Sequence, residues 1–206
     1  MIAIIDYGVG NLFSLKSSFA AIGADAVVTD DPSVIAKADR LILPGVGAFG
    51  DAARKLREGG MGDLVVEQAG LGKPIMGICL GMQLLFEKSY EYGVHEGLGL
   101  IEGVIRPIAD VIPDDYKIPH IGWNALQFCG DKHPLFDGIE QGDAVYFVHS
   151  YYADCQDAVI ATAEYGAPLT AAVAKGNVLG CQFHPEKSGD VGLAILRAFC
   201  EKEEWV

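Results

Sequence analysis

Residues 73–87 read KPIMGICLGMQLLFE, and they combine a fold signal with a chemical one. The apolar run 74–78 predicts a buried strand, and the segment from Leu80 to Phe86 predicts an amphipathic helix. The two meet at Gly77-Ile78-Cys79-Leu80-Gly81, where the glycines allow a sharp turn that projects the cysteine, as in a nucleophile elbow. A helix N-terminus favours the thiolate, the form that attacks carbonyl carbon. Alone, the pattern is equally compatible with a buried cysteine that fills a strand-to-helix corner.

The first half of the chain alternates short apolar runs with helical segments. Expected strands are 2–6, 26–29 and 40–43, and expected helices are 12–22, 31–38, 49–58 and 63–71. This alternation is typical of an open, mostly parallel sheet with helices on both faces, so an α/β fold is expected.

The rhythm changes after the glycine-rich segment 93–103. Further strands are expected at 100–105, 118–128, 144–148, 159–163, 170–174 and 178–183, followed by a last helix at 191–200. The short turns between them favour added antiparallel strands that extend the sheet. With 206 residues, 50% of them hydrophobic, residues 1–206 are expected to form a single domain.

Composition excludes several classes of function. The formal net charge of −13 opposes binding to the phosphates of nucleic acid. The five cysteines form no CxxC pair, so neither a disulfide framework nor a metal site is indicated, and a reduced, cytoplasmic location is expected. No run approaches the roughly 18 apolar residues that a membrane span requires. No pattern calls for a cofactor.

The segment GCQFHPE at 180–186 is the first candidate partner of the cysteine. If the backbone is extended there, His184 and Glu186 share a face, and Pro185 stiffens the connection. A base and its orienting carboxylate need that arrangement. With Cys79 they complete a set of nucleophile, base and orienter, whereas HPE alone is as often the mere end of a strand.

The segment LPGVGAFG at 43–50 matches GxGxxG after a strand. A dinucleotide site is disfavoured, because the match lies inside the chain and the acidic residues about 20 positions later fall in a predicted helix. The backbone N–H groups of Gly45, Val46 and Gly47 are better suited to bind an oxyanion together with the N–H of Leu80. An ordinary glycine turn is the plain alternative.

A third segment, YFVHSYY at 146–152, places Ser150 beside His149. Adjacent strand residues face opposite sides, and no glycine elbow frames the serine, so a serine hydrolase is disfavoured. Substrate contact or simple sheet packing is expected instead.

Together, GICLGMQLLFE, PGVGAFG and FHPEKS resemble the class I (triad) glutamine amidotransferases. More selective segments, DYGVGNL at 6–12, PHIGWN at 119–124 and FVHSY at 147–151, resemble the glutaminase subunits of imidazole glycerol phosphate synthases within that family. The resemblance runs from the first strand to the last helix and implies a flavodoxin-like fold.

The resemblance also implies roles for individual residues. Cys79 would form a glutamyl thioester, His184 would transfer protons, and Glu186 would orient His184. The oxyanion would be bound by the backbone of Gly45, Val46, Gly47 and Leu80. The implied contacts to glutamine are Gln83, Glu91, His149, Ser150 and Tyr151.

The resemblance further implies a heterodimer with a separate cyclase subunit of (β/α)₈-barrel fold, which would receive the ammonia. Asn11, Trp123 and Lys187 are the implied interface residues. Three alternatives stay open, namely a glutaminase that serves another synthase, a thiol hydrolase or isomerase of related fold, and a non-catalytic binding subunit, which would be expected to lack Cys79 or His184. The first should lack the PHIGWN segment, and the second would not need HPE.

Overall fold

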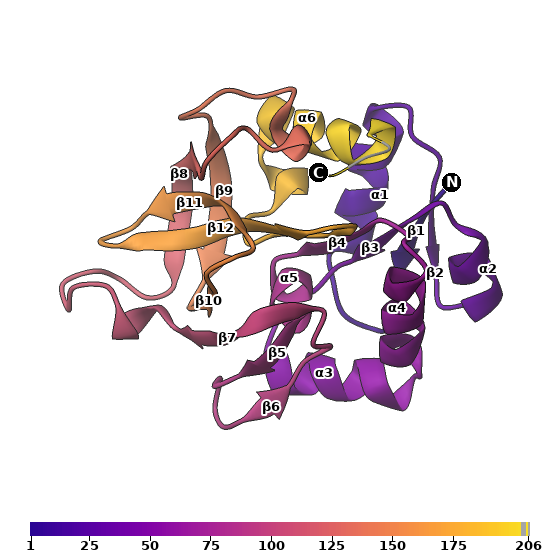
Figure 1. The fold of residues 1–206 in the computed structure, drawn as a ribbon, viewed down its shortest axis with the longest axis horizontal. Coiled ribbons are helices and arrows are strands. Elements are labelled where there is room, and N and C mark those ends of the chain that lie inside the picture. Colours follow the sequence, from indigo (N-terminus) through magenta and orange to yellow (C-terminus); the bar gives the residue numbers. More distant parts are fainter. Residues whose placement is uncertain (203–204, 206) are drawn as a thin grey trace.

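A mixed central sheet organises this computed structural model, which describes residues 1–202 and 205. Its parallel part contains, in spatial order, β2 (Ala26–Thr29), β1 (Ile2–Ile5), β3 (Arg40–Leu43), β4 (Ile75–Ile78) and β13 (Val178–Cys181). Antiparallel strands continue it as β12 (Pro168–Lys175), β11 (Val159–Glu164), β8 (His120–Phe128) and β9 (Ala144–His149). Figure 1 shows the sheet between two groups of helices.

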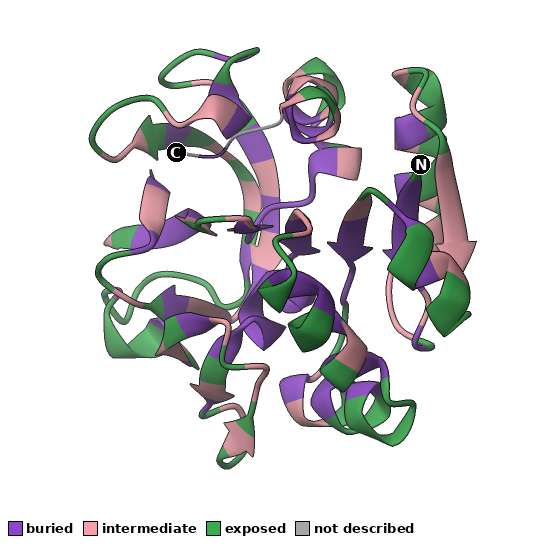
Figure 2. Cartoon of the chain, turned by 45° about the vertical axis from the view of Figure 1, so that its right-hand side comes forward, coloured by how far each residue is buried: buried purple, intermediate pink, exposed green. Residues whose placement is uncertain are grey.

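Helices cover both faces of this sheet because its strands are apolar on both sides. On β1, Ile2 and Ile4 belong to one core cluster, whereas Ala3 and Ile5 belong to another. The first face packs against α1 (Leu12–Ala21) and α6 (Gly189–Glu201), and the second against α2 (Pro32–Lys37), α3 (Phe49–Glu58) and α4 (Met61–Gly70). The buried residues follow the middle of the molecule in Figure 2. The expected α/β class with a mixed sheet is thereby confirmed.

A second, smaller sheet was not expected from the sequence. It contains β10 (Tyr151–Asp154), β7 (Ile101–Pro107), β5 (Phe86–Ser89) and β6 (His95–Glu96), in that order. The prediction that 100–105 extends the main sheet was therefore wrong. The described residues also contain three short 3₁₀ turns, η1 (Ile108–Asp110), η2 (Pro134–Phe136) and η3 (Pro185–Lys187).

The helix after Cys79 is much shorter than expected. Helix α5 (Leu80–Leu84) ends before Phe86, which begins strand β5. The carbonyls of Leu84 and Leu85 accept hydrogen bonds from the N–H groups of Leu98 and Leu100, respectively, so the 97–101 segment replaces a further helical turn. A short apolar run does not by itself distinguish a buried helix from a buried strand, which explains the error.

None of the helices in the part of the chain that the structure describes is long and apolar enough to span a bilayer.

Candidate active site

Cys79 lies between β4 and α5 in a backbone conformation that is rare for a residue with a side chain. Its φ is 55° and its ψ is −114°, and its N–H donates to the carbonyl of Cys181 at 2.8 Å. Strain of this kind persists only where the surrounding structure enforces it. The sharp turn is therefore made by the backbone of Cys79 itself.

The flanking glycines are needed for close packing rather than for the turn, which corrects the expectation. A Cβ on Gly77 would lie 2.6 Å from the carbonyl oxygen of Gly81, and one on Gly180 would lie 2.4 Å from Cγ of Met82. Neither Gly77 nor Gly81 has a positive φ. Strands β4 and β13 approach α5 closely because these positions lack side chains.

His184 and Glu186 form a buried pair. His184 Nδ1 lies 2.8 Å from Oε1 of Glu186, and the two side chains are only 2% and 1% exposed. Pro185 begins the 3₁₀ turn η3, so the expectation of an extended backbone over 184–186 was wrong. A turn still brings the carboxylate to the imidazole, because Pro185 can occupy the first position of a helical turn.

The second ring nitrogen of His184, Nε2, is the one available to hydrogen-bond with the side chain of Cys79. Burial lowers the pKa of His184, but the hydrogen bonds with the side chains of Cys79 and Glu186, together with their charges, outweigh burial and raise this pKa to about 9. An imidazolium with a donor on each nitrogen fits between a thiolate and a carboxylate. The three residues that the sequence analysis grouped therefore lie together.

A hollow of about 340 Å³ opens beside the sulfur. Most of the residues expected at the site line it, namely Val46, Gly47, Cys79, Leu80, Gln83, Glu91, His149, Ser150, Tyr151, His184 and Lys187. Gly45 lies beneath the lining, because a Cβ there would be 2.6 Å from the N of Gly81. Glu186 lies behind His184 and does not line the hollow.

The loop at 44–47 is held from below by the N-terminal segment. The Tyr7 hydroxyl donates to the carbonyl of Pro44 at 2.7 Å, and a Cβ on Gly10 would lie 2.9 Å from Pro44. Burial and the nearby Cys79 raise the pKa of Tyr7, so this hydroxyl keeps its proton. Sequence reasoning missed Tyr7, although it belongs to the DYGVGNL motif.

Glu91 joins two walls of the hollow. Its carboxylate accepts a hydrogen bond from the N–H of Phe49, the first residue of α3. Helix α3 directly follows the 44–48 loop, and a carboxylate at a helix N-terminus is favoured by the helix dipole. Glu91 therefore connects the glycine loop to the segment that faces Tyr151.

Both ring nitrogens of His149 are engaged by protein groups. Its Nδ1 donates to the carbonyl of Tyr151 at 2.7 Å, and its Nε2 lies 3.0 Å from Nδ1 of His120. Burial lowers the pKa of His149 to about 4, so the ring is neutral at pH 7. His149 thus contributes to the wall of the hollow and to the position of Tyr151. His120, which lies in the PHIGWN segment, supports it from β8.

The expected interface residues lie at the rim or outside the hollow. Trp123 on β8 is 57% exposed, and its ring centroid lies 6.0 Å from that of Tyr146 on β9. The ammonium of Lys187 lies 5.9 Å from the centroid of the same tyrosine ring. Asn11 directly precedes α1. The structure thus brings Trp123 and Lys187 together around Tyr146, a residue that sequence reasoning did not single out.

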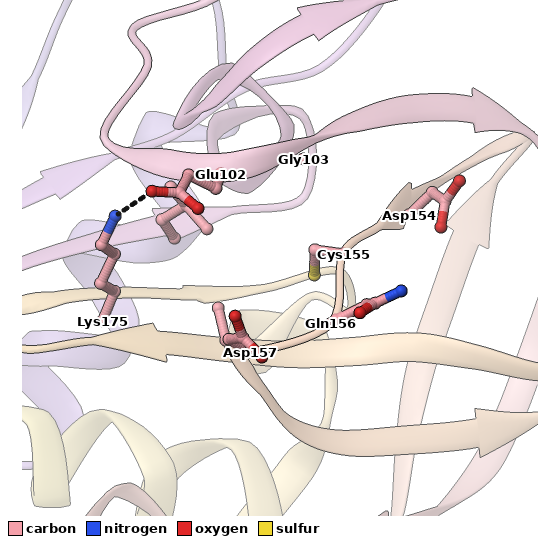
Figure 3. Close-up of a pocket in the computed structure, with 9 residues that line it drawn as sticks. Glu102, Gly103, Asp154, Cys155, Gln156, Asp157 and Lys175 are labelled. Atoms are coloured by element: carbon pink, nitrogen blue, oxygen red, sulfur yellow. Dashed lines mark ion pairs between the residues drawn. The ribbon is translucent and has the colours of Figure 1, made fainter.

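A second hollow, of about 470 Å³, lies elsewhere on the molecule and offers no competing nucleophile. Figure 3 shows Cys155 there among acidic side chains, with an ion pair between Glu102 and Lys175 at 3.7 Å. Burial and the neighbouring Asp154 and Asp157 raise the pKa of Cys155 to about 11, which keeps the thiol protonated. Among residues 1–202 and 205, no His, Cys, Asp or Glu side chains are grouped to hold a metal ion.

Similarity to solved structures supports the fold. One solved structure, described as a glutamine amidotransferase, matches 97% of this chain and 100% of its own, with a TM-score of 0.74 and 20% identity. A PurLQS structure from Thermotoga maritima matches 97% of this chain and 96% of its own, with a TM-score of 0.71 and 21% identity.

Sequence similarity is closer. The subunit HisH of imidazole glycerol phosphate synthase from Wolinella succinogenes is 50% identical over 204 residues, which cover 98% of this chain and 99% of that protein. The HisH subunit from Sulfurimonas denitrificans is 52% identical over 202 residues, 97% of each chain. The family model for class-I glutamine amidotransferases matches residues 3–202. On the strength of that nearly full-length match and of its buried Cys79, His184 and Glu186, the chain belongs to the class I glutamine amidotransferase family.

Proposed function

We propose that this protein is the glutaminase subunit of an imidazole glycerol phosphate synthase, which hydrolyses glutamine and supplies ammonia for histidine biosynthesis. The observation that carries the glutaminase reaction is the hydrogen-bonded series Cys79, His184 and Glu186 beside a hollow of about 340 Å³. The choice of synthase is supported by relatives that share half of their residues with this chain over nearly its whole length.

In the first half-reaction, the thiolate of Cys79 attacks the carboxamide carbon of glutamine. The carbonyl oxygen becomes an oxyanion, for which the backbone N–H of Leu80 and those of Val46 and Gly47 are the candidate donors. His184 gives its proton to the departing nitrogen, and ammonia leaves as the C–N bond breaks. The products are a glutamyl thioester and a neutral imidazole.

In the second half-reaction, the neutral His184 removes a proton from water as the water attacks the thioester carbon. The C–S bond breaks, glutamate leaves, and the thiolate and imidazolium of the resting state are restored. Glu186 holds the imidazole in one orientation in both steps, because its Oε1 is hydrogen-bonded to Nδ1 of His184. The single-domain organisation and the cytoplasmic location remain predictions of the same proposal.

The amino-acid end of glutamine meets polar groups that line the hollow. Glu91 supplies negative charge for the ammonium group, and Ser150 and Tyr151 line the same hollow. The amide nitrogen of Gln83 donates to Tyr151 and Gln182, so its oxygen is the atom that remains for substrate. His149 supports the wall of the hollow through the carbonyl of Tyr151.

Ammonia requires an acceptor, and we assign it to a separate cyclase subunit of (β/α)₈-barrel fold. Three exposed apolar side chains support a docking surface near the hollow, those of Ile121 and Trp123, each 57% exposed, and that of Val46, 42% exposed. Ile121 and Trp123 point the same way on β8, so they form a continuous apolar face with Tyr146. Lys187 and Asn11 complete the proposed interface.

Reconstitution with the cyclase tests the proposal. We expect glutamate release to be slow for the chain alone, faster with the cyclase, and fastest with cyclase and its nucleotide substrate, with one imidazole product formed for each glutamine consumed. Equal rates under all three conditions would contradict the assigned partner. A glutamine analogue with an electrophile at the carboxamide carbon should label Cys79, and failure to label it in the complex would contradict the glutaminase itself.

A further inference from the structure

The side-chain amide of Gln83 has only one possible orientation. Its Nε2 lies 3.2 Å from the carbonyl oxygen of Tyr151. A backbone carbonyl accepts hydrogen bonds and cannot donate, so the nitrogen of the Gln83 amide, not the oxygen, must face Tyr151. The same nitrogen lies 2.9 Å from Oε1 of Gln182.

This contact in turn orients Gln182. Because Gln83 presents N–H, Gln182 must present its oxygen to it, and the amide nitrogen of Gln182 is then directed to the other side. That nitrogen lies 3.7 Å from Sγ of Cys79, within hydrogen-bond distance for sulfur. The Gln182 side chain is fully buried, so water does not compete for its N–H.

The roles of the other polar groups near the sulfur of Cys79 are compatible with a hydrogen bond from Gln182 to it. Tyr7 directs its hydroxyl hydrogen to Pro44 and remains protonated. Cys181 is buried, and burial raises the pKa of its thiol, with Glu186 and Cys79 adding to the effect. His184 carries the positive charge that balances a thiolate, and Glu186 lies on its far side.

We propose that Gln182 is a catalytic residue of this reaction, whose amide N–H donates to the sulfur of Cys79 and holds it as the thiolate. The inference rests on the proposed role of Cys79 as nucleophile. Hydrogen bonds to a charged acceptor are the stronger class, and burial strengthens them. Gln83 acts through Gln182 and is to that extent a positioning residue in addition to its contact with substrate.

Alkylation of Cys79 by iodoacetamide tests this without glutamine turnover. The rate is followed from pH 5.5 to 10 by mass spectrometry of the peptide that contains Cys79, in the full chain and in Gln182→Met. The methionine side chain has a similar length and carries no N–H group. We expect alkylation of Cys79 in Gln182→Met to be about tenfold slower at pH 6 and within about twofold of the parent at pH 10, because a lost bond to a charged acceptor changes the ionisation equilibrium by about that factor.

Thr170→Val is the matched control. It removes another buried side-chain donor, the Thr170 hydroxyl that donates to Ala153 at 2.7 Å, without changing a group that contacts the sulfur. The two variants should lose similar thermal stability, but only Gln182→Met should shift the alkylation profile. Identical profiles in the parent and Gln182→Met would overturn the inference, as would an equal slowing at every pH. Alkylation that does not favour Cys79 in the parent would instead contradict its proposed role as nucleophile.

Discussion

Gly81 and Leu43 approach each other so closely that a side chain at residue 81 cannot be accommodated. A Cβ on Gly81 would lie 1.8 Å from the carbonyl oxygen of Leu43, far inside any real contact. Leu43 ends β3 and leads into the 44–47 loop, whereas Gly81 is the second residue of α5. This contact therefore sets the distance between the glycine loop and the nucleophile.

Gly81→Ala should prevent normal folding or displace the 44–47 loop, because the obstructing atom is backbone and has no flexible end. We expect the free energy of unfolding to fall by more than about 3 kcal/mol, the range of severe overpacking. Gly70→Ala is the control, because a Cβ at that position in α4 would meet no atom within 4 Å and should gain up to about 1 kcal/mol from helix propensity. Chemical denaturation measures both, and equal stabilities would contradict the packing argument.

Gly47→Ala tests the conformation of the loop separately from its packing. Gly47 has a φ of +92° and open space around its Cα, so alanine adds backbone strain without a clash. We expect kcat for glutamine hydrolysis in the complex to fall by roughly 10²-fold, the usual effect of losing one oxyanion donor.

Gly142 offers a closely matched control for this substitution. Its φ is +93°, and a Cβ there would also meet no atom within 4 Å. Gly142→Ala should cost similar stability and leave glutaminase activity unchanged. If both variants lose activity equally, the loss comes from general destabilisation and the loop has no special role.

Glu186→Gln keeps an oxygen that can accept from Nδ1 of His184 but removes the negative charge. The imidazolium is then less stabilised, so kcat should fall by about 10² or more while KM for glutamine changes little. Glu102→Gln is the control, since that carboxylate pairs with Lys175 at 3.7 Å beside the other hollow (Figure 3). Steady-state kinetics with the cyclase present would contradict the assignment if Glu186→Gln retained full activity.

His184 makes a contribution to stability that depends on pH in a defined direction. Its pKa is about 9 in the folded protein and about 6.5 when unfolded, so between these values the folded His184 side chain holds a proton that the unfolded side chain has lost. The stabilisation is complete below pH 6.5 and is lost as the pH rises through 9. It amounts to roughly 3 kcal/mol for a buried group.

The imidazole NMR signals of folded His184, assigned with His184→Asn and followed from pH 6.5 to 8.5, measure this protonation directly. The signals should remain those of an imidazolium across the series, because the folded-state pKa is about 9. A midpoint near pH 6.5 would show that His184 is not protonated in the folded state at neutral pH.

Much of the parallel half of the fold follows from sequence. Strands 26–29 and 40–43 and helix 49–58 have the bounds that local periodicity predicts. Each is a local pattern, in which apolar spacing and a flanking glycine or proline suffice. The second sheet was missed because a strand pattern does not show which strand it pairs with, as Tyr151 does with Pro107.

The kind of chemistry at this site follows from the sequence alone. The site requires a cysteine between a strand and a helix, a histidine followed by proline and glutamate, and a glycine loop. These residue types are given directly by the amino-acid sequence. How these residues act depends on contacts that form only in the folded protein. The strained φ of Cys79 and the amide orientation of Gln182 both depend on groups that are distant in sequence, namely the carbonyl of Cys181 and the side chain of Gln83. Hydrogen-bond direction and close packing arise only when those groups meet, so no local pattern could encode them.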